Sequence, residues 1–127
     1  MARPAAKELT ERELAVMQVF WKHGEITAQE ARDQLARASV DRAYTTVATL
    51  IRILTEKGFL KQTTNQRPFG YRAVRSYEDV SRRLLSDLVD RVFGGSREQL
   101  ILRLMEHKKL SAKERARLEQ ILWENRR

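Results

Sequence analysis

The chain has 127 residues, and its 25 Lys and Arg exceed its 17 Asp and Glu, which gives a net charge of +8. That length suits one domain, or one small domain with an appendage. The absence of cysteine excludes a disulfide framework, a thiolate metal site and a catalytic thiol. The positive balance favours a polyanionic partner, nucleic acid before anionic lipid.

The sequence also carries no sign of membrane insertion or catalysis. No apolar run approaches the roughly 18 residues that a membrane span needs, and residues 1–7 lack the apolar core of a signal peptide. His23 and His107 each fall at the end of an expected helix, where a cation complements the helix dipole. Neither has carboxylates at metal-ligand spacing, and no phosphate-binding glycine loop appears. We therefore expect a cytoplasmic protein with no metal, cofactor or catalytic residue, and not an enzyme.

Four segments have the spacing of a helix capping box, in which Ser or Thr is followed three residues later by Glu or Gln. The hydroxyl accepts from an orphan backbone N–H at the helix start, and the Glu or Gln side chain reaches back to the cap. Each match precedes an apolar periodic run, so together they predict a mainly α protein. The four matches are Thr10/Glu13, Thr27/Glu30, Ser96/Gln99 and Ser111/Glu114.

The first half has the element order of a winged helix-turn-helix domain. Apolar spacing predicts three helices, at about residues 10–22, 27–36 and 42–57. Two short stretches rich in aromatic and β-branched residues then flank a polar turn at 65–68, which predicts a β-hairpin wing. We place this domain at residues 1–75. The order alone does not decide the function, because protein-binding modules share it.

The outer face of the third helix is a candidate for DNA recognition. Opposite its apolar stripe stand Thr45, Thr49 and Arg52, with Tyr44 and Thr46 in the first turn. Short hydroxyls suit a helix pressed into a major groove, and Arg can read guanine or bind phosphate. The alternative is an ordinary solvated surface, but Thr is a poor helix former and such a face would more often carry Glu, Lys and Gln.

The expected wing is strongly basic. From Lys57 to Arg75 the chain has five Lys and Arg and no Asp or Glu. A hairpin with this charge can lie along a phosphate backbone, with Arg67 at the turn as the best candidate for a contact. The alternative is a basic edge strand that is charged against aggregation. The candidate DNA-binding residues are therefore Arg42, Tyr44, Thr45, Thr46, Thr49, Arg52, Arg67 and Arg72.

Residues 76–127 are expected to form a three-helix dimerisation domain. Three helices this short bury too little surface to be robust alone, and a second copy would complete their core. A symmetric dimer would present two recognition helices to a palindromic operator. The alternative is an intramolecular bundle packed on the N-terminal domain. The expected dimer residues are Val80, Leu84, Leu88, Val92, Leu100, Ile101, Leu104, Leu118, Ile121 and Leu122.

Several stretches resemble the penicillinase-repressor family, often called BlaI/MecI. They are residues 9–17, 43–50, 54–60 and 93–96, of which the Tyr-Thr-Thr-Val run followed by Lys-Gly is the most specific. The resemblance extends over residues 9–123. It implies a winged-helix domain, a helical dimerisation domain and repression by occupying an operator. It also places the DNA contacts at Tyr44, Thr45, Thr46, Thr49, Arg52 and Arg67.

The resemblance further implies relief of repression by proteolysis, in which a membrane sensor detects β-lactam. In the best-known members the cut bond follows Asn and precedes Phe, and the matching positions here are Arg103 and Leu104. Many members carry Arg at the position of Ile53, whereas this chain has Arg52, so we expect a different base preference. The copper-sensing branch uses a cysteine cluster, which this chain lacks.

The leading hypothesis is therefore a dimeric, operator-specific repressor in an antibiotic-resistance circuit. One alternative is a winged-helix module whose basic surface binds an acidic protein. Another is an architectural binder that is indifferent to DNA sequence, for which salt dependence would be steep and discrimination small.

Overall fold

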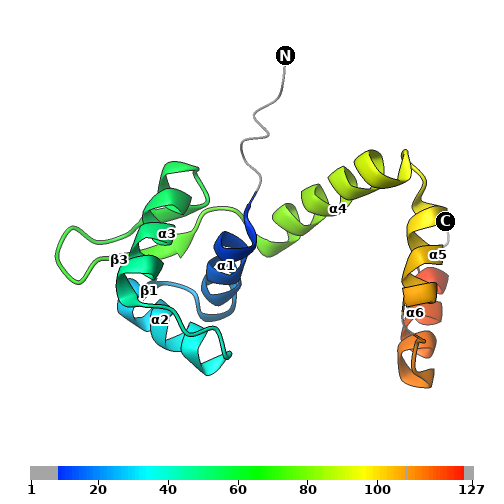
Figure 1. Cartoon of the computed structure of the whole chain (residues 1–127), viewed down its shortest axis with the longest axis horizontal. Coiled ribbons are helices and arrows are strands. Elements are labelled where there is room, and N and C mark those ends of the chain that lie inside the picture. Colours follow the sequence, from blue (N-terminus) through cyan, green and yellow to red (C-terminus); the bar gives the residue numbers. More distant parts are fainter. Residues whose placement is uncertain (1–8, 108, 125–127) are drawn as a thin grey trace, which may run out of the picture. The chain divides into compact units, whose positions relative to one another are not determined.

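The computed structural model describes residues 9–107 and 109–124. The chain divides between Ser81 and Arg82 into two compact units, and each is considered by itself. The elements follow the expected order of three helices, a hairpin and three further helices (Figure 1). The prediction of a mainly α protein with a winged-helix domain is confirmed. The helices of the described residues are all too short or too polar to cross a membrane.

The N-terminal unit begins with helices α1 (Glu11–His23), α2 (Ala28–Arg37) and α3 (Tyr44–Glu56). Complete capping boxes open α1 at Thr10 and α2 at Thr27, as the spacing predicted. The three expected helices are therefore confirmed, and their ends differ from the predicted ones by one or two residues.

The wing is part of a three-stranded antiparallel sheet. Strands β2 (Leu60–Gln62) and β3 (Gly70–Ala73) form the expected hairpin. A third strand, β1 (Ile26–Thr27), pairs with the other edge of β3, which gives the order β1-β3-β2. Two residues are too few to show a period-2 pattern, so the sequence did not predict β1.

The core of the N-terminal unit draws on all three helices and the wing. Its side chains are less than a tenth exposed, and Phe20 of α1 is the largest of those below 2% exposure. Phe59 and Leu60, at the start of the wing, belong to the same cluster. The hairpin is therefore anchored to the helices by apolar burial, the main favourable term in folding. The cluster comprises Val16, Met17, Val19, Phe20, Ala31, Leu35, Val47, Ile51, Leu54, Phe59, Leu60 and Val80.

One ion pair inside this unit joins the start of α1 to the end of α3. The Glu13 carboxylate, in a residue only 4% exposed, accepts hydrogen bonds from Lys57 Nζ at 2.8 Å and from the Thr10 backbone N–H at 2.9 Å. Burial raises the pKa of Glu13, but the hydrogen bonds from Lys57 and Thr10 and the Lys57 charge outweigh it. The net pKa of Glu13 is lowered, so its charged form is stabilised in the fold.

Helix α4 (Tyr77–Phe93) starts inside the N-terminal unit, so the boundary between the units lies six residues beyond the predicted end at residue 75. Tyr77 meets the Trp21 ring edge-on, with the ring centroids 5.3 Å apart. Val80 is 4% exposed and belongs to the core cluster. Its expected place among the dimer residues is therefore corrected, because its side chain is already covered within its own chain.

The C-terminal unit contains the rest of α4, α5 (Arg97–His107) and α6 (Ala112–Glu124). Gly94 and Gly95 end α4 with φ values of 57° and 87°, a conformation that residues with a Cβ avoid. Capping hydroxyls of Ser96 and Ser111 accept from the backbone N–H three residues on, as predicted.

Candidate nucleic-acid interface

The outward face of α3 has the composition and exposure of a recognition surface. Thr45, Thr49 and Arg52 are exposed, while Val47, Ile51 and Leu54 on the opposite side are buried. The structure thus separates the two faces of α3 where the periodicity placed them. Tyr44 is exposed as well, and Thr46 is half-buried. The helix offers short hydroxyls, a phenol and a guanidinium to a partner outside the fold.

Within the described residues, no side chain caps the backbone N–H groups at the start of α3. Ala43 occupies the N-cap and supplies no side-chain hydrogen bond, and the first turn contains no acidic residue. The turn before it is held by Arg32, whose Nε donates to the Arg42 carbonyl at 3.2 Å and whose guanidinium lies 3.9 Å from Asp41. Arg42, half-buried, is therefore fixed through its backbone at the entry to α3.

Arg52 does not stand alone on this face. Its Nη1 lies 3.2 Å from Glu56 Oε2, one turn further along α3, and both side chains are mostly exposed. Exposed pairs at this spacing contribute about 0.3–0.5 kcal/mol, so the pair orients Arg52 without preventing it from exchanging Glu56 for a base or phosphate.

The wing presents fewer cations than the sequence suggested. Of the five from Lys57 to Arg75, Lys61, Arg67 and Arg72 are exposed. Lys57 pairs with Glu13, and Arg75 lies over the Phe59 ring, 5.2 Å from its centroid. The two end members of the basic run therefore stabilise the fold, and three remain on the surface.

Arg67 lies where a phosphate contact was expected, in the loop between β2 and β3. Its guanidinium carbon stands 5.5 Å from the centroid of the Phe69 ring. Figure 1 shows this loop extending beyond the helices of the unit. Stacking on an aromatic ring restricts the side chain while leaving its N–H donors accessible. Arg72 is exposed on β3, and Tyr71 is packed against the core.

The C-terminal unit has a different surface, on which many large apolar side chains are exposed. Leu104 of α5 is 58% exposed and Trp123 of α6 is 69% exposed. Leu100 is half-buried. Apart from the buried Val80, the remaining expected dimer residues are also more than a third exposed. The sequence analysis did not single out Leu102, which is 44% exposed. The exposed members of the predicted set are Leu84, Leu88, Val92, Ile101, Leu104, Leu118, Ile121 and Leu122.

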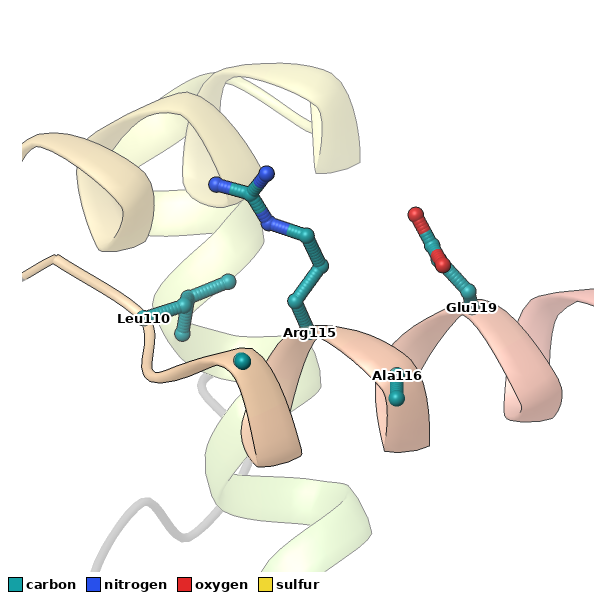
Figure 2. A pocket seen from close by; sticks show the side chains of 5 residues that line it. Leu110, Arg115, Ala116 and Glu119 are labelled. Carbon is teal, nitrogen blue, oxygen red and sulfur yellow. The ribbon is translucent and has the colours of Figure 1, made fainter.

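Neither unit shows an alternative site among its described residues. No group of three or more His, Cys, Asp or Glu in that part of the chain is placed to hold a metal ion. A shallow hollow lies on α6, where Figure 2 shows Arg115 and Glu119 extending from the helix beside Leu110 and Ala116. Its lining mixes one cation, one anion and small apolar groups, a composition with no evident chemistry.

Comparison with known proteins identifies the family. The family model described as penicillinase repressor matches residues 9–124. A penicillinase repressor of Bacillus licheniformis is 29% identical over 94% of this chain and 92% of its own length. The methicillin resistance regulatory protein MecI of Staphylococcus aureus strain N315 is 25% identical over 91% and 93%.

Solved structures agree with this result. The solution structure of the DNA-binding domain of the repressor BlaI matches with a TM-score of 0.51 and 29% identity. The match covers 62% of this chain and 93% of that domain. With the model match over residues 9–124, the chain belongs to the penicillinase-repressor family.

Proposed function

We propose that this protein is a transcriptional repressor that binds an operator in double-stranded DNA through α3 and the wing. The observation that carries the proposal is the face of Thr45, Thr49 and Arg52, exposed opposite a fully buried stripe on the same helix. In this arrangement α3 lies in the major groove, where Arg52 reads a base edge. The relatives' names, a penicillinase repressor and a DNA-binding domain of BlaI, support it.

In the proposed complex, backbone contacts flank the base contacts. Arg67 and Arg72 of the wing neutralise phosphates, and Tyr44, Thr46 and Arg42 contact the backbone near the start of α3. The uncapped N–H groups at Ala43 suit a phosphate oxygen, because the positive end of the helix dipole favours an anion. No step of this function is enzymatic.

The proposed repressor is a homodimer held together by the C-terminal unit. Exposed apolar side chains lie on α4, α5 and α6, and a monomer would leave them in water. A second copy is the occupant that buries the same surface on both partners. Two recognition helices then meet one duplex, so the operator is palindromic, with half-sites about one helical turn (~34–36 Å) or a multiple of it apart.

The proposed relief of repression is cleavage within α5 by a membrane sensor protease that responds to β-lactam or another envelope signal. The candidate bond joins Arg103 and Leu104, both exposed in the chain. Arg103 is 3.1 Å from Glu106 in an exposed ion pair that adds little stability. A cut there would break the helix that carries Ile101 and Leu104, and the loss of the dimer would weaken operator binding.

Fluorescence anisotropy on the duplex upstream of the protein's own gene tests the proposal. The competitor is a shuffled duplex of equal composition, at two salt concentrations. A preference of about a thousandfold or more at near-physiological salt is expected for a specific repressor. Equal, salt-sensitive binding to both would instead favour the architectural binder, and weak binding to both would favour a module for an acidic protein.

A further inference from the structure

A hydrogen bond ties the base of the wing to the first half of the domain. Thr63 follows β2, and its hydroxyl donates to Glu25 Oε2 at 2.7 Å. Glu25 stands in the turn between α1 and β1, 38 residues earlier in the chain. The bond therefore joins the segment that follows β2 to the turn that precedes β1, the strand at the opposite edge of the sheet.

Gly70 makes room for this bond. A Cβ on Gly70 would stand 2.8 Å from Thr63 Oγ1 and 3.3 Å from Glu25 Oε2, the two atoms that share the hydrogen bond. The same residue closes the loop through its backbone. Its carbonyl accepts from the Thr63 N–H at 2.8 Å, and its N–H donates to Thr64 Oγ1 at 2.9 Å.

These contacts lie at the two ends of the loop that carries Arg67. The loop enters at Thr64 and returns at Phe69, and Arg67 lies over the Phe69 ring. Fixing both ends of a short loop reduces the conformations that must be lost when its tip binds. Contacts at the base can therefore act on affinity without touching the partner.

We propose that Glu25 is a positioning residue for DNA binding, which holds the wing through Thr63 so that Arg67 meets the phosphate backbone. This inference rests on the proposed function of the wing. The charge of Glu25 makes the two explanations predict opposite effects, because an exposed carboxylate near DNA repels phosphate. Its removal would strengthen binding if only charge mattered, whereas loss of a positioning contact weakens binding.

The test measures operator affinity by anisotropy for Glu25→Ala, Glu25→Gln and Thr63→Val, with circular dichroism as a check of folding. Glu25→Ala and Thr63→Val should weaken binding roughly threefold to tenfold, and Glu25→Gln should recover most of the loss because its amide oxygen still accepts. Glu11→Ala, which removes an exposed carboxylate in the first turn of α1, is the control for charge alone and should not weaken binding.

A double-mutant cycle with Arg67→Ala identifies the route of the effect. Glu25→Ala should weaken wild type but not the Arg67→Ala protein, because the contact that it positions is then absent. Unchanged or tighter binding by Glu25→Ala in wild type, or equal weakening in both backgrounds, would overturn the proposal. If Arg67→Ala itself binds like wild type, the proposed role of the wing fails and this inference falls with it.

Discussion

The two units of this chain differ in how far they bury their apolar side chains. The N-terminal unit places Phe20, Met17 and Ile51 below 2% exposure in one shared core. The C-terminal unit leaves large apolar side chains of α5 and α6, such as Leu104 and Leu122, more than half exposed. Burial of apolar surface is the main favourable term in folding. The first unit is therefore a complete fold, and we interpret the second as half of one.

Under the proposed function, this difference gives each unit a separate task. A complete fold can hold a rigid polar surface, as the N-terminal unit holds the outer face of α3 above a buried stripe. An incomplete fold gains stability by association, and association multiplies the DNA contacts. Each of the following predictions alters one side of this comparison.

The largest effect is expected from a charge in the exposed apolar surface. Leu104→Asp would place a carboxylate in the proposed dimer interface, where an unpaired charge is strongly disfavoured. We expect a monomer by light scattering and a loss of operator affinity of about 10²–10⁴. Gln99→Asp adds the same charge near the exposed start of α5 and should leave the dimer intact. Dimeric Leu104→Asp protein would contradict the assignment of this surface.

The next two variants compare the core of the N-terminal unit with the exposed apolar surface of the C-terminal unit. The comparison is whether the loss of stability depends on protein concentration. Phe20→Ala removes the largest fully buried side chain of the N-terminal unit and should lower the free energy of unfolding by about 3–5 kcal/mol. That loss should not change with concentration. For Leu122→Ala, the fall in melting temperature should grow on dilution, because dissociation is linked to unfolding. Calorimetry at two protein concentrations measures the loss of stability in each variant. If that loss depends on concentration in the same way for both variants, the proposed difference between the two units is wrong.

A smaller effect is expected at the ion pair between α1 and α3. Glu13→Gln removes the buried charge that faces Lys57 at 2.8 Å, and we expect a loss of about 1–3 kcal/mol near neutral pH. Because the fold lowers the pKa of Glu13, the stabilisation is complete above the unfolded pKa of about 4.3. It is lost as the pH falls through the folded value.

Urea unfolding of wild type and Glu13→Gln at several pH values checks this prediction. The difference between the two proteins should shrink as the pH falls below the unfolded pKa of about 4.3, because Glu13 then takes up a proton in the unfolded chain first and, at still lower pH, in the fold as well. A difference that stays constant down to acid pH would show that the charge of Glu13 has no part in the stability of the fold.

An effect of similar size is expected for base recognition on α3. Arg52→Ala should cost about 1–3 kcal/mol on the operator and relax specificity at one base position, if Arg52 reads that base. Anisotropy on a panel of single-base operator variants measures both quantities. Glu56→Gln removes the ion-pair partner of Arg52 and serves as the matched control, since it leaves the guanidinium in place. A uniform loss over the whole panel would instead assign Arg52 to a phosphate.

Much of the fold was predictable because its signals are local. Capping boxes such as Thr10/Glu13 and the apolar spacing of α3 act within a few residues, and they placed the helix ends within one or two residues. The exposed Thr face follows from the same periodicity, because burial of one stripe on a helix exposes its opposite side.

The missed features depend on contacts between distant parts of the chain. Glu13 meets Lys57 across 44 residues, and Glu25 meets Thr63 across 38. Neither pairing leaves a local pattern. The division into compact units differs from the predicted domain boundary for a related reason: the apolar ridge of α4 continues through Val80, although that residue packs in the N-terminal core. Periodicity shows which face of a helix is apolar and does not show what covers it.

The mass of the full chain in solution tests the interpretation of the C-terminal unit most directly. Light scattering at micromolar concentration should give twice the chain mass of 14.9 kDa. That result would mean that the exposed apolar side chains of α4, α5 and α6 are covered by a second copy. A mass of one chain at that concentration would contradict the dimer and leave this surface without its proposed partner.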